Sequence, residues 1–578
     1  MLSYRKLAMR VLGRPLHTGG GIDSPRPASQ RAAALVLTAA LLTGAAFPAF
    51  ADTYYIENGD ITISAGESGN DVTQNNVTTK NDTNTIITNQ KTDTASSHTV
   101  TIDAGNDKVE VTLEDVNIKA DSGSALTSKG DVTLTLKGDN HLTGGNGDTY
   151  GGSGISSSGS LTISGGETDS LTAQGGSGEN GGDGISSKDL TISGGTVTAT
   201  GGNSTGIVGS GGSGIHSGGD VTISGGTVTA TGGDSTGSDG SGGYGIYSSS
   251  TTTISGGTVT ATGGDSTGSY SSGGYGIYSS GVTISGGSTV TANGGNGGRL
   301  VGGDGIRSSG GVTISGGTVK AAGGNGKDGY GGNGISSTST TISGGTVTAN
   351  GGSGNSSGGN GIRSNGVAIS GGTVNAAGGD GGNGKDGGNG IISRNIDLSG
   401  SLELTAKAGS PNGKALSQND NELDLDTIKD KLGPGAKITA INANGDSKQV
   451  SIPRPVEPEK PVIPEESSSS SDGGSSAPSA SVSSLPGLTV TDKSGAVISY
   501  TSTQSGNTLT VCVGRLTASL HVSLAALRQL RAEGIETITF QTILCSTTLS
   551  VDELLAMGGE DAEAVLTHRL TDSSLTVG

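Results

Sequence analysis

The sequence predicts an all-β protein, a right-handed parallel β-helix solenoid followed by a small C-terminal α+β domain. Three observations favour this fold class. The 578 residues include 111 glycines but only 11 Tyr, three Phe and no Trp, too few aromatic side chains for an ordinary globular core. A motif of the form V-T-I-S-G-G-T-V-T-A recurs at spacings of 27 to 31 residues, and such self-similarity indicates a solenoid. Within each repeat, apolar residues alternate with the period of two that is typical of strands.

Composition also excludes several other classes of protein. Glycine does not recur as G-X-Y and there are only 13 prolines, which excludes a collagen triple helix. Two cysteines are too few for a disulfide scaffold. A net charge of -19 argues against a nucleic-acid-binding protein.

Each repeat carries two landmarks at a nearly constant separation. The central apolar residue of the long motif lies at Leu134, Ile163, Ile192, Ile223, Ile254, Ile284, Ile314, Ile342 and Ile369. The second landmark, G-G-x-G-I, ends at the marker isoleucines Ile155, Ile185, Ile215, Ile246, Ile277, Ile306, Ile335, Ile362 and Ile391, with small variations. We expect three short strands per coil, joined at glycine corners, with ladders of Ile, Val and Ala inside. The Gly/Ser/Asn/Asp-rich inserts, such as residues 200–212, are expected to emerge at one corner and to stack.

The two ends of the chain differ from the repeats. A basic segment, the apolar residues 32–47 and the A-F-A sequence at 49–51 predict a secretory signal peptide. Ser523 is a predicted N-cap for a helix, and Ser550 with Glu553 forms a predicted capping box. The expected organisation is a signal peptide (1–51), the solenoid (52–408, with irregular N-terminal coils at 52–120), its C-terminal end (409–452), a Pro/Ser-rich linker (453–487) and the α+β domain of unknown role (488–578).

Residues 111–118, 124–126 and 131–136, together with the V-T-I-S-G-G-T-V-T-A coils, resemble a family of secreted bacterial carbohydrate-binding domain proteins with a right-handed parallel β-helix. The resemblance covers roughly residues 52–408. It implies polysaccharide binding, of cellulose or polygalacturonate, together with a pectate-lyase-like shape and calcium sites. A protein of this kind is expected to be extracellular or at the cell surface, in possible association with the cell wall. No integral membrane segment is expected after signal cleavage.

The residue that follows each marker isoleucine should face solvent, and this position contains the candidate carbohydrate-binding residues. They are Tyr247, Tyr278, Arg307 and Arg363, joined by Tyr244 and Tyr275, two positions before their isoleucines. We expect the four tyrosines to form two stacked pairs on adjacent coils. Their rings could contact pyranose faces while the arginines pair with uronate carboxylates. The alternative is that the side chains stack only to stabilise the surface.

Calcium is a second candidate ligand. The G-G-x-G-x-D sequences that end at Asp328 and Asp386 match the core of the calcium-binding nonapeptide, although the tandem repeats of that roll are missing. Asp304 is a further candidate oxygen ligand. Bound calcium would let an acidic rod hold an acidic polysaccharide.

The cysteines leave two alternatives open. Cys512 and Cys545 could form a disulfide in an oxidising compartment or remain two buried thiols.

The expected function is secreted, non-catalytic binding of plant cell-wall polysaccharide, such as cellulose or pectate, with calcium as a possible aid. The alternative is a surface adhesin or structural stalk that contacts host or matrix ligands. An enzyme is not predicted, because no acidic cluster accompanies Arg307 and Arg363. Regular Thr-Val-Thr segments are also the layout of ice-binding proteins, but Lys320 and Asn375 interrupt them.

Overall fold

A computed structural model describes residues 52–453 except Asn383, and residues 487–577 with gaps at 493–495, 499, 506, 514, 516, 543–545, 558–562 and 569–572. The expected signal peptide and nearly all of the expected linker lie outside the described residues. The chain divides into two compact units, residues 1–458 and 459–578.

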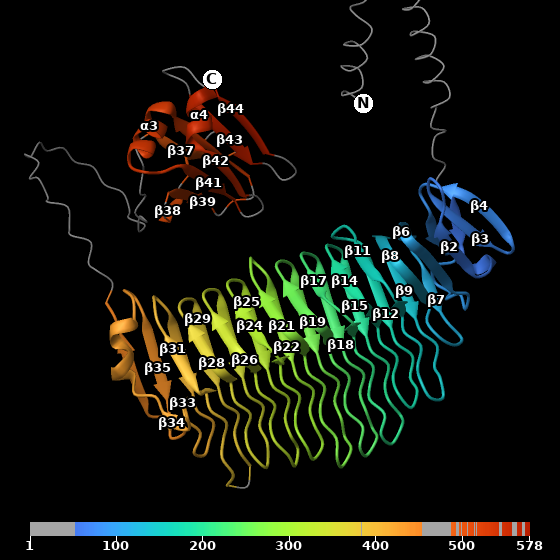
Figure 1. Ribbon diagram of the computed structural model, residues 1–578, viewed down its shortest axis with the longest axis horizontal. Helices are drawn as coiled ribbons and strands as arrows, with labels where there is room; N and C mark the ends of the chain where they lie inside the picture. Colours follow the sequence, from blue (N-terminus) through green and yellow to red (C-terminus); the bar gives the residue numbers. More distant parts are fainter. Residues whose placement is uncertain are drawn as a thin grey trace, which may run out of the picture. The chain divides into compact units, whose positions relative to one another are not determined.

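The first unit is a parallel β-solenoid of about 15 turns, which confirms the predicted parallel β-helix (Figure 1). Its strands belong to two long sheets of 23 and 13 strands. In one coil, β16 (Ile215–Ser217) and β17 (Val221–Ile223) lie in the larger sheet, and β18 (Thr227–Thr231) lies in the smaller one. The expected three segments per coil are therefore present, but two of them share one bent sheet.

The larger sheet contains the marker isoleucines and the V-T-I segments. Separate short strands carry them in some coils: β10 (Ile155–Ser157), β11 (Ser160–Ser164), β13 (Ile185–Ser187), β14 (Asp189–Ile192), β23 (Ile306–Ser308), β24 (Gly311–Ile314), β30 (Ile391–Ser393) and β31 (Asn395–Leu398). Longer strands cover both segments in the others: β6 (Val100–Glu114), β8 (Leu126–Lys137), β19 (Ile246–Ile254), β21 (Ile277–Ile284), β26 (Ile335–Ile342) and β28 (Ile362–Ile369).

The smaller sheet contains the T-V-T-A segments and closes with an antiparallel strand. Its strands are β7 (Asn117–Lys119), β9 (Asp139–Thr143), β12 (Ser170–Gln174), β15 (Thr196–Thr200), β18, β20 (Thr258–Thr262), β22 (Thr289–Asn293), β25 (Thr318–Ala322), β27 (Thr346–Asn350), β29 (Thr373–Ala377), β32 (Glu403–Lys407), β35 (Lys437–Ile441) and β36 (Ser447–Ser451).

Irregular elements occupy both ends of the solenoid. At the N-terminal end they are β1 (Thr53–Tyr55), η1 (Ile56–Asn58), β2 (Ile61–Ala65), β3 (Asn70–Gln74), β4 (Val77–Asp82) and β5 (Ile86–Thr88). At the C-terminal end they are β33 (Leu416–Gln418), β34 (Asn421–Glu422) and η2 (Leu425–Lys431). The antiparallel pairings β2–β3, β3–β4 and β35–β36 break the parallel stacking at the two ends. Such elements cover sheet edges that would otherwise pair with other chains.

In-register stacking of identical aliphatic residues builds the core. Ile215, Ile246 and Ile277 pair on successive strands, and all three are fully buried. One continuous cluster of buried residues extends from Tyr54 to Val450. Each coil adds a few small aliphatic side chains, so burial accumulates along the solenoid without aromatic residues.

At the corner where the inserts leave the core, hydrogen bonds between glycines alternately join successive coils and close the neck of each insert. Gly202 donates its N–H to the carbonyl oxygen of Gly182 (2.7 Å) and accepts from the N–H of Gly212 (2.9 Å), which in turn pairs with Gly233 (2.8 Å). We call the whole chain of such bonds the glycine spine. Its members are Gly123, Gly145, Gly152, Gly176, Gly182, Gly202, Gly212, Gly233, Gly243, Gly264, Gly274, Gly295, Gly303, Gly324, Gly332, Gly352, Gly359, Gly379, Gly388 and Gly409.

Close approach explains why glycine occupies the spine. A Cβ atom on Gly264 would lie 2.0 Å from the carbonyl oxygen of Gly233, well inside van der Waals contact. The insert residues beyond the spine form a second stacked layer, the outer lobe, which Figure 1 shows as a row of loops along one side of the solenoid. The outer lobe comprises residues 146–150, 177–180, 203–210, 234–241, 265–272, 296–301, 325–330, 353–357, 380–382 and 384–386. Bridges such as Ser204 to Ser235 and Ser235 to Ser266 connect its layers, so the inserts stack as expected.

In the second unit, the described residues form two four-stranded sheets and two helices, in agreement with the predicted α+β domain. Its elements are β37 (Leu488–Thr491), β38 (Thr501–Ser505), β39 (Thr508–Cys512), β40 (Ala518–Ser523), α3 (Leu524–Ala532), β41 (Thr537–Gln541), β42 (Ser546–Ser550), α4 (Val551–Met557), β43 (Glu563–His568) and β44 (Ser573–Val577). Ser523 caps α3, because its Oγ accepts the N–H of Ala526 at 3.2 Å. Ser550 Oγ likewise accepts the N–H of Glu553 at 3.4 Å before α4.

The glycine spine generates the first prediction. Gly264→Ala should destabilise the protein by about 3 kcal/mol, because the added methyl group overlaps the Gly233 carbonyl. Gly287→Ala is the matched control, since no heavy atom lies within 4 Å of its added Cβ, and it should change stability by less than about 0.5 kcal/mol. Thermal unfolding and hydrogen exchange across residues 233–295 would measure both variants. Equal unfolding midpoints for the two would contradict a space-limiting role for the spine.

Candidate functional site

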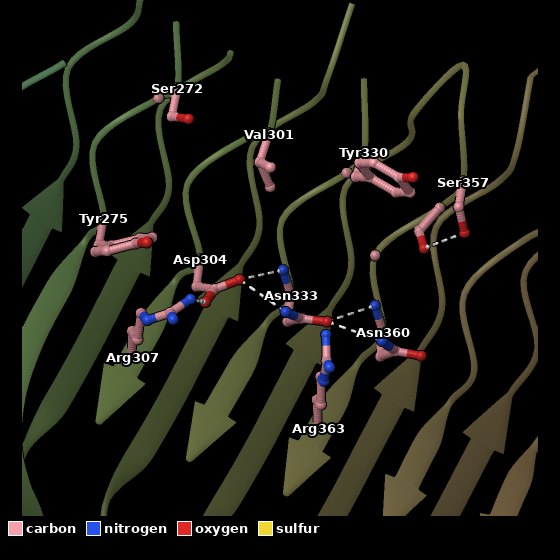
Figure 2. A pocket seen from close by; sticks show the side chains of 15 residues that line it. Ser272, Tyr275, Val301, Asp304, Arg307, Tyr330, Asn333, Ser357, Asn360 and Arg363 are labelled. Atoms are coloured by element: carbon pink, nitrogen blue, oxygen red, sulfur yellow. Dashed lines mark hydrogen bonds and ion pairs between the residues drawn. The ribbon is translucent and has the colours of Figure 1, made fainter. Parts of the chain in front are cut away.

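A hollow of about 400 Å³ lies between the larger sheet and the outer lobe. Figure 2 shows its three parts: arginines rise from the strand side, a row of short polar side chains forms the floor, and residues of the outer lobe form the opposite wall. Glycines at the junction of the coils and the lobe also line the hollow: Gly273, Gly302, Gly331, Gly358 and Gly359. Its labelled side chains are Ser272, Tyr275, Val301, Asp304, Arg307, Tyr330, Asn333, Ser357, Asn360 and Arg363.

The floor is a ladder of Asp and Asn side chains, one per coil, two residues before the marker isoleucines Ile306, Ile335, Ile362 and Ile391. Asp304 Oδ1 accepts both the backbone N–H (2.6 Å) and the Nδ2–H (2.9 Å) of Asn333. Asn333 Oδ1 accepts the same two groups from Asn360, at 3.0 and 2.9 Å, and Asn389 continues the pattern. The repeated bonds fix each amide, so the floor presents ordered polar groups.

Arg307 lies at the N-terminal end of this ladder. Its Nη1 donates to Asp304 Oδ2 at 3.1 Å, and its Cζ lies 5.0 Å from the centre of the Tyr275 ring. Burial raises the pKa of Asp304, and the hydrogen bonds from Asn333 and the charge of Arg307 oppose that rise. Asp304 therefore anchors Arg307 over the tyrosine and neutralises part of its charge.

Arg363 lies two coils further along the same outward row. It is exposed, and among the residues that the structure describes it has no ion-pair partner. Figure 2 shows its side chain directed toward Asn333. A guanidinium group with free donors beside an ordered polar floor is suited to bind a carboxylate.

The wall of the hollow on the lobe side carries two apolar side chains, Val301 and Tyr330, between Ser272 and Ser357. Val301 and Tyr330 are 39% and 56% exposed, and the two form a bridge between neighbouring layers of the lobe. Tyr330 also donates its N–H to the carbonyl of Leu300 at 2.8 Å, which fixes its place on the wall. The hollow thus combines cations on one side with a partly apolar surface on the other.

The four predicted tyrosines come together, but as one array rather than two separate pairs. Tyr244 stacks on Tyr275 at 5.4 Å and Tyr247 on Tyr278 at 5.5 Å, with interplanar angles of 12° and 19°. Contacts of 5.5 to 5.7 Å between the pairs join all four rings. Because the faces are turned toward one another, the array presents mainly ring edges and hydroxyl groups to solvent. Tyr275 alone of the four lines the hollow.

Arg307 and His216 cover the two ends of the tyrosine array. Arg307 lies against Tyr275, while the His216 ring centre lies 4.7 Å from that of Tyr247. Each of them also pairs with a carboxylate: Arg307 with Asp304, and His216 through its Nδ1, which lies 3.2 Å from Asp183 Oδ2. The hydrogen bond with Asp183 raises the pKa of His216, burial opposes this effect, and the charge of Asp183 adds to it. The stack is therefore an ordered part of the surface, in line with the stabilising role considered above.

The candidate calcium ligands are not gathered into one site. Asp304 is committed to Arg307 and Asn333, while Asp386 Oδ1 accepts from Asn412 Nδ2 at 3.0 Å. Asp328 lies in a different outer-lobe layer from Asp386. Among the described residues, no group of three or more His, Cys, Asp or Glu side chains could hold a metal ion. Calcium binding stays a prediction.

The possible disulfide involves a position outside the described residues, Cys545. Cys512 has a free thiol, and its Sγ lies 3.5 Å from Gln541 Oε1.

Sequence reasoning identified the arginines but not the ladder beneath them. The signal is visible in the repeats, where G-G-N-G-I contains Asn333, Asn360 and Asn389 and G-G-D-G-I contains Asp304. Val301 and Tyr330 carried no comparable signal, because they lie in inserts of variable length.

No protein-family model, curated protein or solved structure was found to match this chain. In the part of the chain that the structure describes, no helix is both long enough and apolar enough to cross a membrane.

The His216–Asp183 pair generates a pH prediction. Because the folded-state pKa of His216 is raised above 6.5, the pair contributes stability that is fully present below that value. This contribution is lost as the pH rises through the raised pKa. We expect the thermal midpoint to fall over this window, and to fall less in Asp183→Asn. Thermal scans of both proteins at a series of pH values would check this. An identical pH dependence would show that the pair does not stabilise the fold.

Proposed function

We propose that this protein is a secreted, non-catalytic binder of acidic polysaccharide, and that the hollow holds a polyuronate such as pectate. The observation that carries the proposal is the exposed, unpaired Arg363 guanidinium beside an ordered amide floor. On a chain with a net charge of -19, such a group offers local attraction to an anion that most of the surface would repel.

The remaining residues of the hollow support a sugar rather than a small inorganic anion. Amide and hydroxyl groups of Asn333, Asn360 and Ser357 offer donors and acceptors for sugar hydroxyls. The exposed Tyr330 ring gives an apolar surface for the C–H face of a pyranose. Since the four stacked tyrosines turn their faces toward each other, we assign the aromatic contact to Tyr330 rather than to Tyr247 or Tyr278.

Binding is proposed rather than catalysis because the carboxylate in the hollow already accepts hydrogen bonds from neighbouring side chains of the protein. Asp304 accepts hydrogen bonds from Arg307 and Asn333, and it is 2% exposed. A group held in this way is poorly placed to remove a proton from a substrate. Direct pairing between arginine and carboxylate also makes the proposal independent of calcium.

The test is the affinity of the full chain for polygalacturonate, measured by calorimetry with and without a chelator. Arg363→Ala should weaken binding about tenfold or more, because a charge-assisted hydrogen-bond pair is lost. Arg299→Ala is the matched control, since Arg299 is an exposed arginine of the outer lobe outside the hollow. Binding should also weaken as salt concentration rises.

Two results would contradict the proposal. Equal affinities for Arg363→Ala and the unaltered protein would remove the hollow from the binding site. Failure of the unaltered protein to bind polygalacturonate, together with adhesion to cells or matrix, would favour the adhesin alternative.

The chelator tests a separate point. Loss of binding only in the presence of chelator would show that calcium takes part.

Tyr330 can be tested separately. Tyr330→Ala should weaken polygalacturonate binding several-fold, because the apolar wall is lost while the arginines remain, whereas Tyr247→Ala should have a smaller effect. The same calorimetric titration would measure both variants. A larger loss for Tyr247→Ala would return the aromatic contact to the tyrosine array.

A further inference from the structure

A second hollow adjoins the first on the larger sheet. It has a volume of about 390 Å³, and Arg363 lines both hollows. Its other lining groups are mainly hydroxyls and amides, including Ser336 and Asn365, and it contains one further cation, Arg394. Neither Arg394 nor this hollow is part of the proposed function.

Like Arg363, Arg394 has a guanidinium group that a ligand can reach. Its side chain is exposed and, among the described residues, has no ion-pair partner. Its backbone is held in place, since Asn419 Nδ2 donates to the Arg394 carbonyl oxygen at 3.0 Å. A fixed backbone with an unpaired guanidinium group gives the second hollow the same chemistry as the first.

The three arginines are regularly spaced. Arg307 and Arg363 occupy the same outward row two coils apart, so strand geometry separates their Cα atoms by about 10 Å. Arg394 lies one coil beyond Arg363 and two residues further along the strand direction, about 8 Å away. Similar intervals between cations suit a polymer whose negative charges also repeat at a constant interval.

We propose that the second hollow is a further subsite for the same polyuronate, in which Arg394 binds a carboxylate beyond the one at Arg363. This inference rests on the proposed function and adds a direction and a minimum length to it. The polymer lies along the solenoid from Arg307 past Arg363 and then diagonally to Arg394. Asp420 lines the far side of the second hollow, so a negative charge marks the end of the site.

The experiment compares trigalacturonate and hexagalacturonate on the full chain by calorimetry. The trimer spans one interval between neighbouring arginines, whereas only the hexamer can reach all three. We expect the unaltered protein to bind the hexamer more tightly. Arg394→Ala should weaken hexamer binding about tenfold and trimer binding less, because the trimer keeps the interval from Arg307 to Arg363. Arg363→Ala should weaken both, and Arg394→Lys should retain part of the hexamer affinity.

The outcomes separate the two proposals. If Arg394→Ala leaves hexamer affinity unchanged while Arg363→Ala lowers it, the second subsite is wrong and the proposed function stands. If the unaltered protein binds neither oligomer, the proposed function fails and the subsite fails with it. Asp420→Asn provides an independent check, because removal of the terminal negative charge should strengthen hexamer binding more than trimer binding. An unchanged hexamer affinity in that variant would argue against an end of the site at Asp420.

Discussion

The hydrogen-bonded glycine spine is the constraint on which the rest of the solenoid unit depends. Neighbouring coils approach so closely there that a side chain on Gly264 would overlap a backbone carbonyl oxygen of the preceding coil. Gly264 also donates its N–H to Gly243 and accepts from Gly274, so backbone groups that would otherwise remain unsatisfied at a buried junction are paired. The spine therefore explains the glycine content more directly than flexible turns do, because Gly202, Gly233 and Gly264 have no positive φ angle. They are glycines because there is no space for a Cβ atom.

The spine also produces the shape of the candidate site. Without it, the inserts would be loops on the surface of a simple coil. With it, they form an ordered outer lobe that stands beside the larger sheet, and the space between the two becomes the hollow that Arg363 enters. The inner residues of each coil have little freedom, since Ile335 and Ile362 must stack. The adjacent outward residue is free, and it changes from Tyr to Arg to Ser along the row. The outward residues can therefore vary, and change the chemistry of the surface, without altering the packing of the core.

The repeats were sufficient to predict the solenoid, its inward ladders and the outward row, because strand periodicity determines which side chains point out. They also indicated that the tyrosines would meet. What they could not provide was the distance between the lobe and the sheet, which depends on glycine contacts between residues far apart in sequence. The hollow and the position of Tyr330 on its wall follow from that distance, whereas the pairing of Asp304 with Arg307 joins residues three apart in sequence. The Asn ladder was within reach, since the residue two positions before Ile335, Ile362 and Ile391 is always Asn.

The contrast between Arg307 and Arg363 explains how an acidic protein can present a selective site for an anion. Arg307 pairs with buried Asp304 and lies against Tyr275, so part of its charge is neutralised within the protein. On the ladder two coils further along, Asn360 takes the place of Asp304: its Oδ1 accepts the N–H of Asn389, as Asp304 Oδ1 accepts that of Asn333, but it carries no negative charge. The Arg363 guanidinium above it is left unpaired. A single oxygen-to-nitrogen difference on the floor thus separates a partly neutralised arginine from an unpaired one, while the hydrogen bonds that support the coil remain the same.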